Sequence, residues 1–209
     1  MDQKEKSISD LISVLSGGQK IGRVVTRDDL ALYIGVPNQK LAFVLHHLDR
    51  DLAYDRFEIP KSRGGVRVIH AVKKPIKTYQ RLALQSLSQE FKPSAYAHGF
   101  VEGKSIFTNA YQHRSKKVLV RLDIMDFFPS INFGRVRGMF MAQPFNFGTE
   151  AATCLAQLSC TGEQMSTLPQ GGVLSPYISN MICRRLDSRL AGIAKAWNCD
   201  FTRYADDIT

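Results

Sequence analysis

The chain has 209 residues, 44% of them hydrophobic, which is enough to bury a sizeable core as one large domain or two small ones. Its 28 Lys and Arg outnumber its 19 Asp and Glu, and the formal net charge of +9 favours a polyanionic partner such as nucleic acid. No apolar stretch approaches the ~20 residues that span a bilayer, and residues 1–6 are too polar for a signal peptide. These features argue against a membrane protein and predict a cytoplasmic one.

The first 56 residues are predicted to be helical, with Gly-rich or Pro-containing breaks at 17–18 and 35–38. Two groups of apolar residues are spaced for helix faces: Leu11, Val14 and Leu15, then Leu41, Val44, Leu45 and Leu48. Residues 57–60 and 66–70 read as the two strands of a hairpin around the polar, glycine-containing segment 61–65. This hairpin should be a flexible, positively charged loop.

Further along the chain, residues 75–91 predict a helix, and residues 118–124 predict a buried strand with Asp123 on the face opposite Leu122 and Ile124. Helices are also expected over 132–141 and 151–158. Ser175 and Pro176 suggest an N-cap and first turn, and a single apolar stripe follows them at Ile178, Ile182, Leu186, Leu190, Ile193 and Trp197. A last strand over 199–204 leads into Asp206 and Asp207.

The four cysteines are far apart and form no metal-binding pair. Cys154, Cys160, Cys183 and Cys199 include no C-x-x-C spacing and have no histidine at zinc-finger distance. We therefore expect reduced, mostly buried thiols.

Two acidic clusters follow predicted strands, Asp123 with Asp126 and Asp206 with Asp207. Each carboxylate could simply face solvent or pair with one of the many arginines. If the two strands are neighbours, however, three carboxylates converge, and such like charges are costly unless cations hold them. Two magnesium ions would relieve the repulsion and would suit nucleotidyl transfer.

The acidic clusters lie in sequence blocks that resemble those of reverse transcriptases. YADD at 204–207 is similar to the family's Tyr-x-Asp-Asp box, LDIMDFFPSI at 122–131 to its first-aspartate box, and LPQGGVLSP at 168–176 to its Pro-Gln-Gly box. HGFVEGKSI at 98–106 resembles the Gly-Phe block of the bacterial enzymes. All blocks occur in the family's order, so the resemblance covers roughly residues 57–209.

The resemblance implies metal-binding roles for the acidic residues. Asp123 and Asp206 correspond to the ligands of two Mg²⁺ ions, Asp207 completes the catalytic triad, and the backbone carbonyl of Ile124 is a further ligand. For Asp126, a position facing the triphosphate and a structural role both remain open.

The same resemblance implies a site for the incoming deoxynucleoside triphosphate. Phe128 matches the ring that excludes a 2′-hydroxyl, with a core aromatic as the alternative. Gln170 and Gly171 match residues that contact the nucleotide, with a plain loop as the alternative. Arg63 and Arg67 would bind the triphosphate, and which of the two does so is left open.

NAYQH at 109–113 resembles the Asn-Ala-x-x-His signature of retron reverse transcriptases, through Asn109 and His113. This resemblance implies a cognate structured RNA as template and primer, an RNA-linked single-stranded DNA product, a role in phage defence, and an effector protein as a further partner. The retron Val-Thr-Gly block and the thumb are missing, which predicts a fragment of a longer protein. A group II intron-like or other defence-associated reverse transcriptase and a silent RNA-binding scaffold are the alternatives.

The predicted fold is α/β (α+β), a right-hand polymerase palm with an antiparallel sheet and packed helices. We expect a helical N-terminal extension over 1–56, fingers over 57–117, and an incomplete palm over 118–209. Elements of the fingers could be interleaved near 140–170.

Overall fold

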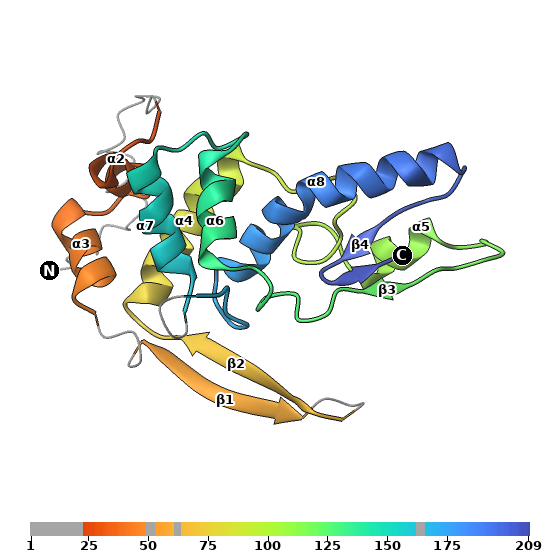
Figure 1. The fold of residues 1–209 in the computed structure, drawn as a ribbon, viewed down its shortest axis with the longest axis horizontal. Helices are drawn as coiled ribbons and strands as arrows, with labels where there is room; N and C mark the ends of the chain where they lie inside the picture. Colours follow the sequence, from red (N-terminus) through yellow and green to blue (C-terminus); the bar gives the residue numbers. More distant parts are fainter. Residues whose placement is uncertain (1–22, 49–52, 61–63, 162–165) are drawn as a thin grey trace, which may run out of the picture.

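The computed structural model describes residues 23–48, 53–60, 64–161 and 166–209 (Figure 1). Its helices are α2 (Arg27–Tyr33), α3 (Asn38–His46), α4 (Ile76–Glu90), α5 (Ile106–Gln112), α6 (Phe133–Met141), α7 (Thr149–Ser159) and α8 (Ser175–Ala196). Its strands are β1 (Tyr54–Pro60), β2 (Val66–Val72), β3 (Leu122–Asp123), β4 (Arg203–Tyr204) and β5 (Asp207–Ile208). All strand pairs are antiparallel, so the mixed helix and sheet class is confirmed.

The first described helices follow local capping signals. The Thr26 side chain accepts a hydrogen bond from the Asp29 backbone N–H, and the Asp29 carboxylate accepts one from the Thr26 backbone N–H, so a capping box begins α2. Gly35, at φ 72°, and the break at 35–38 separate α2 from α3 as predicted. The apolar face of α3 is also confirmed, because Leu41, Val44 and Leu45 are buried. The face predicted at Leu11, Val14 and Leu15 lies outside the described residues.

The predicted hairpin is present and extends along the underside of the molecule (Figure 1). β1 and β2 pair from Tyr54 opposite Val72 to Pro60 opposite Val66. Only the Tyr54 end of β1 is buried, so the rest of that strand projects from the body. The hairpin begins three residues before the expected residue 57.

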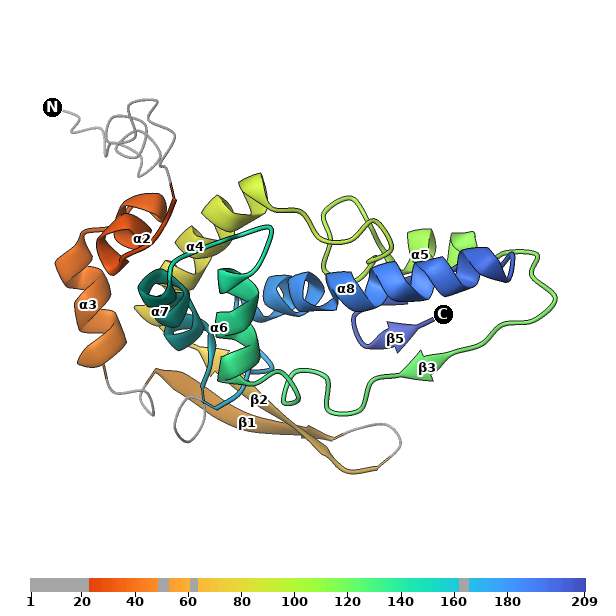
Figure 2. The same cartoon turned by 45° about the horizontal axis from the view of Figure 1, so that its top comes forward.

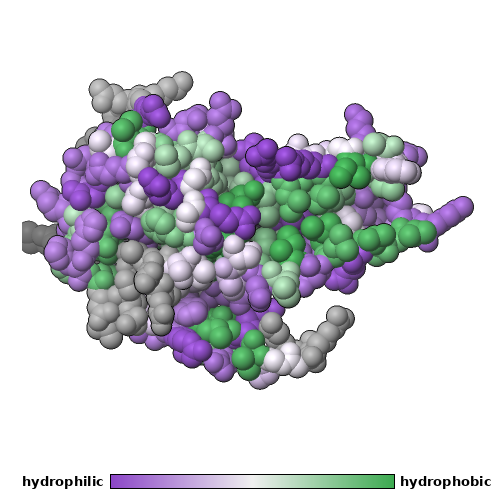
Figure 3. All heavy atoms as spheres, viewed as in Figure 1, coloured by the Kyte–Doolittle hydropathy of each residue, from purple (hydrophilic) through white to green (hydrophobic). Residues whose placement is uncertain are grey.

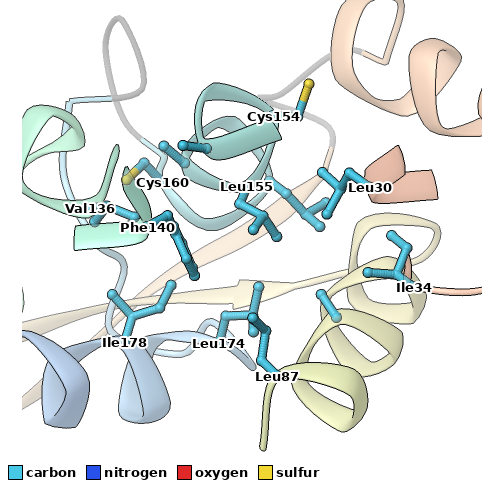
Figure 4. Close-up of a cluster of buried hydrophobic side chains, with 14 of the residues drawn as sticks. Leu30, Ile34, Leu87, Val136, Phe140, Cys154, Leu155, Cys160, Leu174 and Ile178 are labelled. Carbon is cyan, nitrogen blue, oxygen red and sulfur yellow. The ribbon is translucent and has the colours of Figure 1, made fainter. Parts of the chain in front are cut away.

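The core lies where six helices meet, α2, α3, α4, α6, α7 and α8, in the half of the molecule away from the C-terminus (Figure 1). Leu30 of α2, Leu87 of α4, Phe140 of α6, Leu155 of α7 and Ile178 of α8 all point into one cluster and are fully buried (Figure 4). The predicted helices at 75–91, 132–141 and 151–158 are thus confirmed as the packed body.

α8 connects this body to a small sheet with strand order β3-β5-β4 (Figure 2). Two expectations for the helix were wrong. Leu174, not Ser175, is its N-cap, and the Ser175 hydroxyl is buried without a partner within the described chain. The apolar stripe is buried at Ile178 but exposed at Ile193 and Trp197, because the second half of α8 extends beyond the helical body.

The predicted buried strand at 118–124 was also wrong. Val118, Val120 and Leu122 are 79%, 65% and 58% exposed, and only Leu122–Asp123 forms a strand. The reason is the lack of neighbours: β5 offers a pairing edge of two residues, and nothing in the described chain covers the apolar side. The strand expected over 199–204 is likewise reduced to Arg203–Tyr204.

The thiol prediction is confirmed, since none of the four cysteines forms a disulfide within the described residues and three of them are buried. None of the helices within the described ranges combines the length and the apolar composition that crossing a bilayer would require.

Candidate active site

The small sheet brings the predicted acids together. β4 and β5 form a tight hairpin in which Tyr204 pairs with Asp207, and Ala205, at φ 57°, makes the turn with Asp206. Asp123 of β3 is the direct cross-strand partner of Asp207, so the two side chains leave the same face of the sheet. The Ile124 backbone N–H donates to the Asp206 carbonyl at 3.1 Å and fixes the turn against β3.

Asp206 has a perturbed ionisation equilibrium. Burial raises the pKa of its carboxyl above the usual range, and the charges of Asp123 and Asp207 raise it further. Arg67 of β2 acts in the opposite direction, so this arginine lies within electrostatic reach of the acids. A divalent cation would favour the ionised form more strongly still.

The donor set is of the kind that suits magnesium, since it consists of hard carboxylate oxygens. In the described part of the chain, however, no three His, Cys, Asp or Glu side chains are grouped so that they could hold a metal ion. The Asp207 carboxylate accepts a 2.9 Å hydrogen bond from Arg121. The charge of Asp123 contributes to the raised pKa of Asp206, which couples these two carboxylates electrostatically.

A buried polar network, absent from the sequence predictions, supports the turn. Arg203 is fully buried and donates to both carboxylate oxygens of Asp187, at 2.7 and 2.9 Å. It also donates to the Asn180 side chain at 3.0 Å and to the Ala205 carbonyl at 2.8 Å. Burial by itself lowers the pKa of Arg203, but the hydrogen bonds to Asp187 and the charges of Cys183 and Asp187 together outweigh burial, so the pKa lies above its ordinary value. The network thus joins α8 directly to the turn that carries Asp206.

The segment 97–99 packs against the other side of the same turn. The His98 N–H donates to the Arg203 carbonyl at 2.7 Å, and the Asn180 side chain donates to the Gly99 carbonyl at 2.9 Å. A Cβ on Gly99 would lie 2.5 Å from the Ala205 nitrogen, which no side chain tolerates. The sequence carried only weak signals of the buried network of Arg203 and Asp187: an arginine beside Tyr204, and an acid in the helix that bears the apolar stripe.

Two of the residues predicted to bind nucleotide, Gln170 and Gly171, contact β2 of the β1-β2 hairpin. The Gln170 carbonyl accepts from the His70 N–H of β2 at 2.7 Å. Gly171 has φ +114°, and an added Cβ would lie 2.7 Å from the His70 carbonyl oxygen. Both the backbone conformation and the close contact therefore require glycine at this position. Phe128 is half-buried against the core, with its ring centroid 5.3 Å from that of Phe127. Arg63 lies outside the described residues.

The predicted retron residues are on α5, next to β4. The His113 ring nitrogen Nε2 is 2.6 Å from the Thr202 hydroxyl, which ties the end of α5 to the segment that leads into β4. Asn109 has a buried side-chain oxygen without a hydrogen-bond partner within the described chain. His113 therefore has a structural contact, whatever else it binds.

Comparison with known proteins places these features in context. Residues 59–209 match the family described as "Reverse transcriptase (RNA-dependent DNA polymerase)". The chain is 38% identical to the Retron Mx65 reverse transcriptase of Myxococcus xanthus over 88% of its length and 47% of the relative's. It is 35% identical to the Retron Mx162 reverse transcriptase of the same organism, over 86% of this chain and 40% of the relative. It is 32% identical to the Retron Ec86 reverse transcriptase of Escherichia coli, over 76% of this chain and 49% of the relative. The chain thus spans less than half the length of each of these relatives.

Proposed function

The chain belongs to the reverse transcriptase family and is of the retron type, and we propose that it carries the catalytic centre of an RNA-directed DNA polymerase. In this proposal β3, β4, β5 and α8 belong to the palm, and the β1-β2 hairpin belongs to the fingers. The observation that supports it most directly is the pairing of Asp123 with Asp207 beside the turn of Asp206. Chain segments far apart in sequence meet there to form one acidic centre.

We assign the metal-binding role to Asp123 and Asp206, with Asp207 as the third acid and the Ile124 carbonyl as a further ligand. Two Mg²⁺ ions, when bound, would stabilise the attacking and leaving oxygens of an in-line displacement. Burial of Asp206 makes its carboxylate dependent on a compensating positive charge. Arg121 holds Asp207 in the absence of metal and would have to release it for that residue to become a ligand.

The incoming deoxynucleotide would lie between the acids and β2. We assign Arg67 to the triphosphate, because its positive charge lowers the pKa of Asp206 and guanidinium groups bind phosphate oxygens. Gln170 and Gly171 press against β2 and present backbone at close approach, while Phe128 supplies a ring beneath the sugar. These contacts would orient the reacting phosphate for attack by the primer end.

The retron type suggests the substrate and the product. We propose that the complete protein copies a cognate structured RNA into RNA-linked single-stranded DNA, and that this product serves in phage defence with an effector protein. Isolation of the nucleic acid that co-purifies with the full-length protein, followed by ribonuclease treatment and sequencing, tests this. Recovery of DNA without attached RNA would contradict the retron product.

The catalytic assignment is tested by Asp123→Asn and Asp206→Asn in the full-length protein, with Asp55→Asn on the surface of β1 as the matched control. Both site variants should lose primer extension in magnesium, because each lacks a ligand charge, while the control extends like wild type. RNA binding and the far-UV circular dichroism spectrum should stay unchanged in all three. If wild type itself extends no primer, the silent RNA-binding scaffold is the better description.

A further inference from the structure

Three adjoining hollows lie along α8, and Asp123, Asp206 and Asp207 are not in their lining. The first, of 660 Å³, lies between α6 and α8 and includes Arg135, Arg184 and Ser188 in its lining. The second, of 380 Å³, shares Arg184 and Ser188 with the first and adds Tyr96 and Lys195. The third, of 570 Å³, shares Tyr96 and Lys195 with the second. Neighbouring hollows share lining residues, so they follow one another along α8, and we call the three together the α8 groove.

The α8 groove is strongly positive. Arg135, Arg184, Arg185, Lys195 and Lys104 line it. The one carboxylate in its lining, Asp200, is already paired with Lys116. Arg184, Arg185 and Lys195 are exposed and form no ion pair among the described residues. Their charge is therefore uncompensated, and a polyanion is the complementary partner.

The arrangement of α8 explains why the cations gather on one side. Arg184, Ser188 and Lys195 follow each other at helical spacing, whereas Asp187, the sole acid of the helix, points inward to Arg203. A hydrophilic strip accordingly runs along the upper edge of α8 in Figure 3. The third hollow reaches His98 and Thr202, next to the strand that leads into the turn of Asp206, whereas the cations Arg184, Arg185 and Lys195 are exposed to solvent.

The groove also offers features that suit a nucleic-acid strand in particular. Tyr96 is 42% exposed, and its ring is supported from behind by Phe201 at 5.6 Å between centroids, so it can stack a base. Gly192 and Ser188 keep the floor low between the cations, since a Cβ on Gly192 would meet nothing within 4 Å. The hollows, of 380, 570 and 660 Å³, lie within the range of about 300–1,000 Å³ for clefts that bind small ligands, a size that suits single nucleotides better than a duplex.

We propose that the α8 groove binds a single-stranded segment of the RNA partner outside the catalytic site, with its phosphates on Arg184, Arg185 and Lys195 and a base on Tyr96. This inference rests on the proposed function for the identity of the partner. The groove would hold RNA that is not being copied and keep it close to the enzyme between additions of nucleotides.

The test uses the full-length protein with its catalytic site filled by an unlabelled RNA template annealed to a chain-terminated primer. A fluorescent, unstructured RNA oligonucleotide is then titrated at several salt concentrations and followed by anisotropy. The triple variant Arg184→Gln, Arg185→Gln, Lys195→Gln should bind it at least about tenfold more weakly. The slope of log K against log salt should fall by about 2, as expected for three phosphate contacts on a single strand.

The matched control is Lys40→Gln, Lys74→Gln, Arg81→Gln, which removes the same charge from exposed positions on other elements. It should bind the oligonucleotide like wild type, and equal weakening in both triple variants would overturn the localisation to α8. Complete displacement of the labelled RNA by the primer-template would also overturn the proposal. Both triple variants should extend a short annealed primer normally, so a failure of catalysis is seen separately from a failure of binding.

A second measurement locates the base. An RNA oligonucleotide with photoreactive thiouridine should crosslink to the peptide that contains Tyr96 in wild type, and Tyr96→Ala should abolish that crosslink. A crosslink elsewhere contradicts the assignment. A DNA oligonucleotide of the same sequence and anionic phospholipid vesicles complete the comparison, and preferential binding of either one by the groove would rule out RNA as its partner.

Discussion

The buried pair of Arg203 and Asp187 should control both the stability of the protein and the position of its catalytic turn. Arg203 is fully buried, and two of its four side-chain hydrogen bonds go to the carboxylate of Asp187. Asp187→Asn keeps the shape of that side chain but leaves a buried guanidinium without a counter-charge. Breaking a buried pair in this way costs about 3–5 kcal/mol, and we expect a loss of unfolding free energy of that size.

Urea unfolding of the full-length protein, followed by circular dichroism, measures this loss as a lower midpoint at unchanged slope. Asp55→Asn is the control, because it breaks an exposed pair with Lys73 and should unfold close to wild type. If Asp187→Asn unfolds like the control, the carboxylate does not compensate Arg203 and the reasoning fails.

A double variant separates stability from positioning. Asp187→Leu with Arg203→Met replaces the pair by apolar side chains and should recover most of the stability. It still lacks the donor that holds the Ala205 carbonyl at 2.8 Å, so the turn beside Asp206 is free to shift. We expect kcat for single-nucleotide addition to stay about tenfold or more below wild type, because in-line transfer tolerates little misplacement. Recovery of both stability and kcat would mean that the network is purely structural.

Three further predictions concern neighbouring positions. Gly99→Ala should nearly abolish primer extension and lower stability by about 1–3 kcal/mol, since its Cβ would meet the Ala205 nitrogen at 2.5 Å. Burial lowers the pKa of His113 below its ordinary 6.5. The contribution of this group to stability is therefore fully present above pH 6.5 and is lost as the pH falls through the folded-state pKa. His113→Gln should therefore flatten the acid side of a plot of unfolding free energy against pH, and an unchanged slope would contradict the lowered pKa of His113. Phe128→Val should raise ribonucleotide use relative to deoxynucleotide use by at least about tenfold in kcat/KM, or about 1.4 kcal/mol, and an unmoved ratio would make Phe128 a core aromatic.

Local signals in the sequence were sufficient to predict most of the helices and the long hairpin. The apolar spacing of Leu41, Val44 and Leu45 and the turn before Val66 act within a few residues, so they can be interpreted without knowledge of distant contacts. The order of the sequence blocks likewise indicated the family, since Asp123 and the Asp206-Asp207 pair each occur within a longer recognisable pattern.

Tertiary structure alone decided how the site is supported. Whether residues 118–124 form a buried strand depends on what pairs with them, and β5 offers only two residues. The partners of Arg203 are Asp187 and Asn180 on α8, and no periodicity distinguishes an acid that pairs inside from one that faces water. The requirement for glycine at position 99 likewise comes from the Ala205 backbone that lies against it, and no spacing of residues in the sequence indicates such a close approach. Burial and close approach arise between distant segments, so only the folded chain could reveal them.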